Sequence, residues 1–334
     1  MTAPSPQPLA LAGNIAESVL FPAAPRVDTA SRVPASHLDL LAEAGFYGTA
    51  GPVEAGGLGL DYPTACAVVE TFASGCLTTA FVWLQHQGVV LRVAGSELAD
   101  KDELLGDLCR GKRRAGVALG GTLPGPPRVR ATEVPGGYRI TGESPWVTGW
   151  GMTDLLLVTA RDEQDTVVSA LIDARESAEL TVSPPLRLVA TSASATVTAH
   201  FTDLFVPAEA VLGRQPFAEW AERDAAGLRL NGSLALGVIN RCTRLLGPSP
   251  LDEALTACRA RLDTAQTPDL PAARAAADEL AVRASSALLV HTGSRAILAS
   301  EHAQRLAREA LFLLVFASRK GIRAALLDSF FAPR

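Results

Sequence analysis

The sequence lacks paired cysteines, clustered basic residues and long apolar runs, and each absence excludes a class of protein. Its five cysteines contain no C-x-x-C pair and are odd in number, which argues against a disulfide framework or a zinc site and favours a reducing cytoplasm. The net charge is −5 and no basic stripe is present, so nucleic-acid binding is not expected. No run reaches the ~18 apolar residues of a membrane-spanning helix. We therefore expect a cytoplasmic protein with no metal, nucleic-acid or membrane partner.

Aromatic residues are also scarce, at 5%, whereas apolar residues make up 48% of the 334 residues. Alanine and leucine dominate, which favours helices packed on helices. Residues 1–10 are expected to be disordered, and helical patterns occupy most of the rest of the segment 1–114. Short alternating segments with Gly and Pro turns fill 115–212, and helical patterns return over 213–334. The sequence therefore predicts an α+β fold with an N-terminal α-helical domain, a middle β-barrel-like domain and a C-terminal helical bundle.

Local signals place several elements inside these domains. Asp61 is a suitable N-cap for a helix that follows it, and residues 101–109 form a short amphipathic pattern. The pair Gly136-Gly137 between alternating segments predicts a hairpin. One helix is expected over residues 217–246.

Four groups of short motifs follow one another along the chain. They are L-A-E-A-G-F at 41–46 with E-A-G-G-L-G at 54–59, Y-R-I-T-G at 138–142 with W-V-T-G at 146–149, D-L-F-V-P-A-E at 203–209 with L-G at 212–213, and R-L-A-R-E-A at 305–310. In this order they resemble the motifs of the acyl-CoA dehydrogenase family. The resemblance spans nearly the whole chain and implies that family's fold.

The resemblance implies FAD as the cofactor. The isoalloxazine ring of a flavin has apolar faces and hydrogen-bonding edges, so a protein must offer it a wall and a few donors. By resemblance, Trp146 and Val147 would flank the ring, Thr148 would donate near its N5 atom, Ser194 would lie near the phosphates, and Gly293 would belong to a flavin-contact turn. Backbone N–H groups would cover the pyrimidine edge from Leu119, Gly120, Gly121 and Thr122. The alternative for Trp146 is a partly buried core tryptophan with a satisfied indole N–H.

The sequence departs from the family where the catalytic base is expected. Dehydrogenation of an acyl thioester needs a carboxylate within reach of the α-proton. The two places where the family carries this glutamate are Ala317 and Gly227 here, and neither side chain can act as a base. Glu222 or Asp224 would be substitutes, but exposed charges at a helix start explain both more simply. His86, in an apolar helix, is interpreted as a satisfied core or interface histidine.

The leading hypothesis from the resemblance is an FAD-dependent oxidoreductase that oxidises an acyl thioester, on CoA or a carrier protein, at the α,β-bond. The alternatives are a non-catalytic subunit of a heteromeric acyl-CoA dehydrogenase and a flavin-dependent monooxygenase on the same fold. The family completes its cofactor site across subunits, so we expect a homodimer or homotetramer, with a heteromer containing a catalytic paralogue as the alternative.

Overall fold

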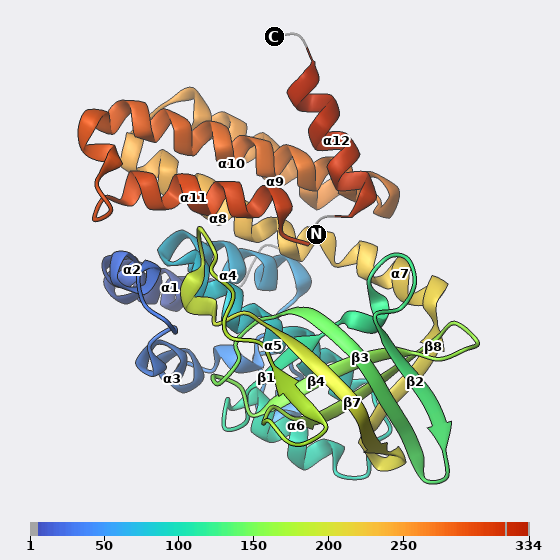
Figure 1. Ribbon diagram of the computed structural model, residues 1–334. Coiled ribbons are helices and arrows are strands. Elements are labelled where there is room, and N and C mark those ends of the chain that lie inside the picture. The colour runs from blue at the N-terminus through green and yellow to red at the C-terminus, as the bar shows by residue number, and fades with distance from the viewer. Residues whose placement is uncertain (1–5, 318, 333–334) are drawn as a thin grey trace.

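The computed structural model describes residues 6–317 and 319–332, in which helices precede and follow a central sheet (Figure 1). The helices–sheet–helices order predicted from the sequence is confirmed. The N-terminal helices are α1 (Pro6–Ile15), the π-helical segment η1 (Ala16–Leu20), α2 (Phe21–Asp28), α3 (Ala35–Glu43), α4 (Tyr62–Gly75), α5 (Leu77–Ala94) and α6 (Lys101–Cys109). The expectation of disorder over residues 1–10 is wrong for Pro6 to Ala10, which form the start of α1, whereas residues 1–5 lie outside the described residues.

Two local predictions hold in these helices. The Asp61 carboxylate accepts a hydrogen bond of 2.8 Å from the backbone N–H of Thr64 and so caps α4. The bounds of α6 are those that the amphipathic pattern predicts. Both elements depend on short-range signals, which a sequence displays directly.

His86 fastens α5 to its neighbours. Its Nδ1 atom accepts a hydrogen bond of 3.0 Å from the N–H of Ala115, at the start of the sheet, so its Nε2–H donates to the carbonyl of Leu108 in α6 at 3.1 Å. Burial lowers the pKa of His86 to about 4, which keeps the ring neutral near pH 7. The interpretation of His86 as a satisfied buried histidine is confirmed.

The middle segment is one mixed sheet, which has eight strands within the described residues. The strand order is β6-β7-β3-β2-β4-β5-β8, and β1 pairs in parallel with β4. The predicted hairpin is confirmed, since β2 and β3 pair antiparallel around Gly136, whose φ is +83°. The strands are β1 (Ala115–Ala118), β2 (Val129–Val134), β3 (Gly137–Val147), β4 (Leu155–Arg161), β5 (Thr166–Asp173), β6 (Leu180–Val182), β7 (Val197–Pro207) and β8 (Val211–Pro216). The sheet therefore extends four residues beyond the predicted boundary at 212.

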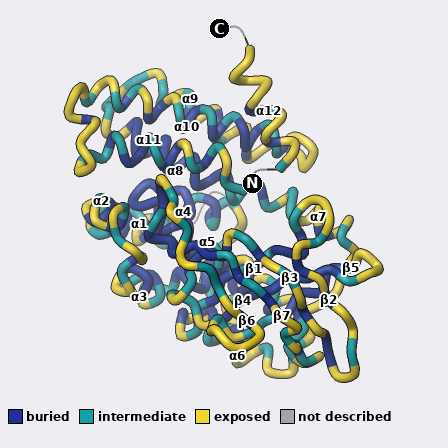
Figure 2. The backbone as a smooth tube through the Cα atoms, viewed as in Figure 1, coloured by how far each residue is buried: buried dark blue, intermediate teal, exposed yellow. Residues whose placement is uncertain are grey.

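The last segment is helical, and Figure 1 shows α8 to α12 as a bundle at the top and α7 below them beside the sheet. Its helices are α7 (Phe217–Ala226), α8 (Leu228–Leu246), α9 (Pro250–Thr264), α10 (Leu270–Thr292), α11 (His302–Val315) and α12 (Lys320–Phe331). The single helix expected over 217–246 is in fact two, because the chain turns at Gly227 between α7 and α8. The buried residues of Figure 2 lie mainly where the bundle, the N-terminal helices and the sheet meet.

Helices α4 and α8 join the two helical segments into one core. A Cβ atom on Gly237 of α8 would lie 2.4 Å from the carbonyl oxygen of Glu70 in α4, so only glycine permits this approach. Arg241 of α8 donates to the carbonyl of Ser74 at 2.7 Å and pairs with Glu17 of η1 at 2.5 Å. A single hydrophobic cluster includes residues of both segments.

Within residues 6–317 and 319–332, no helix combines the length and apolar character needed to cross a membrane. The same part of the chain contains no group of three His, Cys, Asp or Glu side chains placed to hold a metal ion. The five cysteines are buried and free.

Candidate functional site

A chain of three buried hydroxyl groups lies beside the end of β3. Thr148 Oγ1 is 3.1 Å from Thr196 Oγ1, which is 2.7 Å from Ser194 Oγ. Each hydroxyl carries one proton, so these three groups have three protons for two contacts. The described residues offer no further recorded partner for this chain, which leaves one O–H to donate to another acceptor. The structure thus brings together Thr148 and Ser194, two of the predicted cofactor residues, through Thr196.

Trp146 stands next to this chain of hydroxyls with an exposed side chain. Its indole is 64% exposed, so it is not the partly buried core tryptophan of the alternative interpretation. Its φ of +63° is a left-handed conformation that bulky residues rarely adopt, and such strain gathers at functional sites. Val147 points instead into the core of the sheet, where it is fully buried.

These residues fit a flavin ring. The spare hydroxyl proton supplies a donor for a ring edge, and Trp146 supplies a flat apolar face. Ser194 is completely buried one hydroxyl away from Thr148, a position that suits a ring edge better than a charged phosphate. The cofactor roles of Thr148 and Trp146 remain predictions that this geometry supports.

The turn at Leu119–Thr122 differs from its predicted role. The N–H of Gly120 donates to Ser144 Oγ at 3.0 Å, and the N–H of Thr122 donates to the carbonyl of Leu119 at 3.0 Å. A Cβ atom on Gly121 would lie 2.6 Å from Ala160 Cα in β4. Gly120 and Gly121 therefore let the turn pack against the sheet. Of the four backbone N–H groups in this turn, those of Gly120 and Thr122 already donate hydrogen bonds within the chain and so do not cover a pyrimidine edge.

Gly293 lies apart from the other predicted cofactor residues. It ends α10 with a φ of +70°, and nothing lies within 4 Å of the Cβ atom that it lacks. The turn between α10 and α11 is at the far end of the helical bundle from the sheet (Figure 1). Within this chain, Gly293 does not join the site beside β3.

Helix α5 lies between the hydroxyl chain and the turn that contains Ala317. Val82 Cγ1 is 3.6 Å from the position of a Cβ atom on Gly149, which follows Thr148. On the same helix, the ring of Phe81 contacts that of Phe316 edge-on, with centroids 5.0 Å apart. The sheet side of the candidate site and the expected place of the base are thus on either side of α5.

An ion pair connects the two places where a base is expected. Ala317 adopts a left-handed conformation, with φ +48°, in the turn between α11 and α12. Arg319 in that turn donates to the carboxylate of Asp224, one helical turn before Gly227. The interpretation of Asp224 as an exposed charge at a helix start is wrong, because Asp224 is ion-paired and lies in the last turn of α7. Glu222 is exposed, as expected, but it lies in the middle of α7 and not at its start.

The sequence reasoning missed Thr196 and the pair of Asp224 with Arg319. A signal existed for Thr196, because hydroxyl residues recur through the run T-S-A-S-A-T-V-T at 191–198. No local signal exists for the ion pair, whose members are 95 residues apart in the sequence.

A family model described as acyl-CoA dehydrogenase, N-terminal domain, matches residues 9–112. The match covers the helices from α1 to α6, which include the N-cap at Asp61 and the buried His86. The N-terminal third of the chain thus resembles the N-terminal domain of acyl-CoA dehydrogenases.

Relatives are similar to this chain in sequence, and a solved structure has the same fold. The 3-sulfinopropanoyl-CoA desulfinase of Variovorax paradoxus is 28% identical over 163 residues, 47% of this chain and 41% of that protein. The benzylmalonyl-CoA dehydrogenase of Aromatoleum aromaticum is 26% identical over 66% of this chain and 60% of its own length. The matched regions thus span under two thirds of these relatives. The fold matches butyryl-CoA dehydrogenase from Megasphaera elsdenii with a TM-score of 0.84 at 17% identity, covering 99% of this chain and 100% of that one.

Proposed function

We propose that the chain binds FAD beside β3 and acts on an acyl thioester without the carboxylate that acyl-CoA dehydrogenases use as a base. The observation that carries the proposal is the ion pair of Asp224 with Arg319, which spans the segments containing Ala317 and Gly227. A guanidinium at this place cannot take a proton, and the neighbouring carboxylate is engaged by it. The geometry therefore supports a flavoprotein of this family whose reaction does not begin with base-assisted removal of the α-proton.

Each side of the site has its own task in this proposal. When bound, the flavin supplies redox chemistry at its N5 atom. Thr148 would orient the ring by donating the spare proton of the hydroxyl chain, and Trp146 would cover a face of the ring. The aromatic side chains of Phe81 and Phe316 would exclude water on the helical side.

The relatives offer a precedent for such chemistry. One is named as a desulfinase of 3-sulfinopropanoyl-CoA, a reaction on an acyl-CoA that its name distinguishes from dehydrogenation. Arg319 would suit an acyl group that carries an anion, because a guanidinium binds carboxylate and sulfinate oxygens in the same forked geometry. We include release of an acidic group from the acyl chain among the reactions to be tested.

A second candidate is α,β-dehydrogenation with Asp224 as the base. It is favoured by the position of Asp224 one helical turn from Gly227. If Asp224 is the base, the wild-type chain oxidises octanoyl-CoA with a dye acceptor, and Asp224→Asn abolishes this oxidation. If the leading proposal holds, the wild-type chain does not oxidise octanoyl-CoA at all.

The first experiment measures whether the chain, expressed alone, binds flavin. We expect a visible flavin spectrum after reconstitution with FAD and gel filtration. A colourless protein would contradict FAD binding by this chain and favour the non-catalytic subunit of a heteromer.

The second experiment restores the base. Ala317→Glu places a carboxylate where the family carries it, and general-base catalysis contributes roughly 10²–10⁴-fold. We expect oxidation of octanoyl-CoA with a dye acceptor to appear in this variant. Ala218→Glu, at an exposed position in the first turn of α7 and away from both expected base positions, is the matched control and gains nothing. Oxidation by the wild-type chain would contradict the leading proposal.

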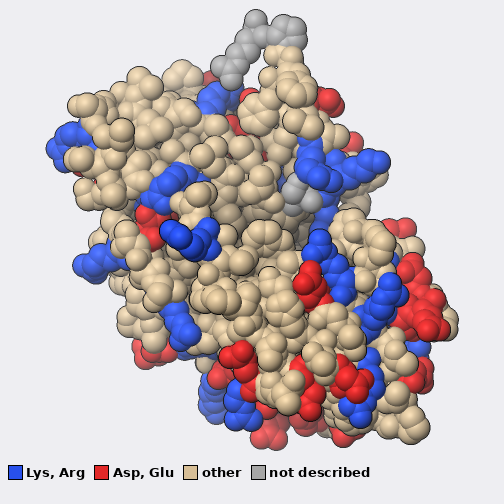
Figure 3. All heavy atoms as spheres, viewed as in Figure 1, with Lys and Arg blue, Asp and Glu red and all other residues tan. Residues whose placement is uncertain are grey.

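We also propose that the chain forms a two-fold symmetric oligomer through the helical bundle. Figure 3 shows a broad area of the bundle without charged side chains, whereas charges crowd the sheet end. Large apolar side chains are exposed on α10, α11 and the turn between them at Val290, Ile297, Leu298, Leu311 and Val315. Sedimentation at micromolar concentration is expected to give a dimer or tetramer, and a monomer would contradict the proposal.

A further inference from the structure

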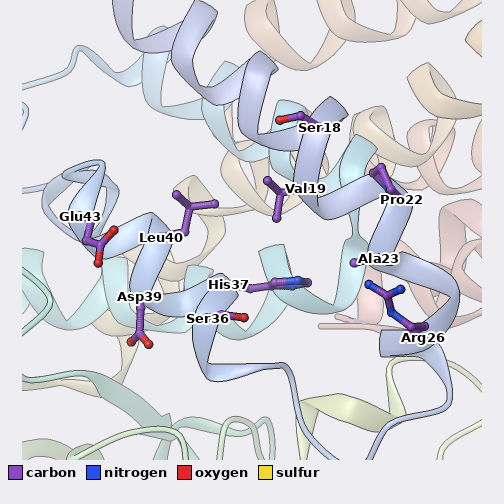
Figure 4. A pocket seen from close by; sticks show the side chains of 10 residues that line it. All are labelled: Ser18, Val19, Pro22, Ala23, Arg26, Ser36, His37, Asp39, Leu40 and Glu43. Carbon is purple, nitrogen blue, oxygen red and sulfur yellow. The ribbon is translucent and has the colours of Figure 1, made fainter.

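A cavity of about 630 Å³ lies between the first helical stretch and α3. Figure 4 shows side chains of η1 and α2 on one side and side chains of α3 on the other. The volume falls within the range of small-molecule sites. The cavity contains none of the residues assigned above to the flavin or to the base.

His37 gives this cavity a buried polar group without a partner. Only 6% of His37 is exposed, and its Nδ1 atom has no hydrogen-bond partner among the described residues. In Figure 4 the ring extends from α3 toward Ala23 and Arg26 of α2. Buried polar atoms in folded proteins are almost always hydrogen-bonded, so this nitrogen is available to a partner that enters the cavity.

The surroundings of His37 are positive. It belongs to the first turn of α3, where Pro34 provides no side-chain cap and no acidic residue is present. The first-turn N–H groups and the helix dipole therefore attract negative charge. Arg26 also lines the cavity, is exposed, and has no carboxylate within ion-pair distance in the described part of the chain. Burial, and then the charge of Arg26, lowers the pKa of His37, which keeps the ring neutral with one N–H to donate.

The acidic groups of the cavity limit the charge of a ligand. Asp39 is held by Arg114 at 2.6 Å, and Glu43 lies six residues along α3 from His37, about 9 Å by helical rise. A dianion would be repelled by this end of the cavity more strongly than a monoanion. Val19 and Leu40 supply apolar surface between the two ends.

We propose that this cavity binds a small monocarboxylate. The carboxylate lies between Arg26 and the first turn of α3 and accepts a hydrogen bond from His37, and its short apolar chain contacts Val19 and Leu40. This site is separate from the proposed flavin site, so it does not depend on the proposed function.

Thermal unfolding with sodium butyrate, against sodium chloride at the same ionic strength, tests the proposal. A ligand that binds only the folded state raises the midpoint, and we expect about 2–4 °C at saturating butyrate. Arg26→Gln is expected to abolish the shift. Arg32→Gln, which removes an exposed arginine that does not line this cavity, is the matched control and keeps it. An equal loss in both variants, or no shift in the wild type, would overturn the proposal.

A second measurement reads His37 directly. The chain has five histidines, so ring ¹⁵N resonances of labelled protein can be assigned by comparison with His37→Asn. We expect butyrate to move the Nδ1 resonance of His37 saturably, and an unchanged resonance would overturn the site. Inorganic phosphate at the same ionic strength is expected to act more weakly, and an equal response would overturn the assignment to a monocarboxylate.

Discussion

The sheet side and the helical side of the candidate site are built from different chemistry. On the sheet side, Thr148, Thr196 and Ser194 form a chain of uncharged hydroxyls. On the helical side, Asp224 and Arg319 form an ion pair near Ala317, and Arg305 pairs with Glu309 inside α11. Neutral groups hold a hydrogen-bonding geometry over a wide pH range, whereas paired charges depend strongly on both partners.

This difference separates the two sides by how closely they match the expected site. The sheet side has a donor and an aromatic face suited to a flat cofactor. The helical side has an alanine and a glycine at the two expected base positions, with an ion pair between their segments. The proposed cofactor contacts and the expected base positions can therefore be tested by separate substitutions.

The largest expected effect comes from breaking the buried ion pair on the helical side. Arg305 and Glu309 are both 2% exposed and lie 2.6 Å apart. Glu309→Ala would leave the guanidinium unpaired, and we expect a loss of ~3–5 kcal/mol in the free energy of unfolding, measured with urea. The control Glu301→Ala disrupts an exposed pair with Arg295 and is expected to cost less than about 1 kcal/mol. Similar losses in the two variants would show that the helical side does not depend on buried charge.

The next effect should be an acid sensitivity that arises at His86 in α5, the helix between the two sides, and not in the uncharged hydroxyls of the sheet side. The pKa of His86 is about 4 in the folded chain and near 6.5 in the unfolded chain, so the unfolded chain binds more protons between these values. Stability therefore falls as the pH drops from about 6.5 toward 4, by up to ~3 kcal/mol from His86 alone. His302, whose pKa is also lowered to about 4 by burial, adds a smaller contribution because it is only half-buried.

Urea unfolding at several pH values measures this dependence. His86→Gln is expected to flatten the curve, although it also lowers stability at neutral pH by losing the bonds to Leu108 and Ala115. His200→Gln, which replaces a half-exposed histidine of β7, is the control variant. An unaltered slope in His86→Gln would show that another group is responsible.

A smaller effect is expected from the hydroxyl chain. Thr148→Val keeps the shape of the side chain and removes its O–H, so the FAD dissociation constant should rise about tenfold, or ~1.4 kcal/mol. Titration of the apoprotein with FAD measures it. Thr202→Val, at an exposed position of β7, is the control. Unchanged affinity in Thr148→Val would remove Thr148 from the cofactor site.

The smallest effect concerns the ion pair near Ala317. Asp224 and Arg319 are each about 30% exposed, so Arg319→Gln should lower the free energy of unfolding by no more than about 1 kcal/mol. The loss should shrink as salt is added, because ions screen partly exposed charges. A loss that does not change with salt would show that Arg319 acts through packing instead.

The sequence was most informative where the signal is local. The N-cap at Asp61, the bounds of α6 and the hairpin at Gly136 follow from a few adjacent residues. The end of α7 at Gly227 was missed because the hydrophobic pattern continues from α7 into α8. Helix propensity depends on the local sequence, so it does not predict a turn that is required by packing between helices distant in the sequence.

The site was predictable only in part for the same reason. The motif at 146–149 identified Trp146 and Thr148, whose surroundings suit a cofactor. The glycines at 120 and 121 were given a ligand role, yet their lack of a side chain serves packing against β3 and β4. Glycine marks a close approach of backbone, and the sequence does not say whether the approaching group is a ligand or a strand.

The close contact at Gly237 has a mechanical consequence. Because α8 rests against the backbone of α4 there, the N-terminal helices and the bundle cannot slide past each other without breaking a shared core. The sheet, by contrast, connects to this frame through two short crossings, between α6 and β1 and between β8 and α7. The sheet also packs on α5 through a second shared core, in which Val89 and Val90 meet Ala115 and Leu155. A cofactor bound beside β3 would therefore lie against walls that the folded chain has already fixed in place.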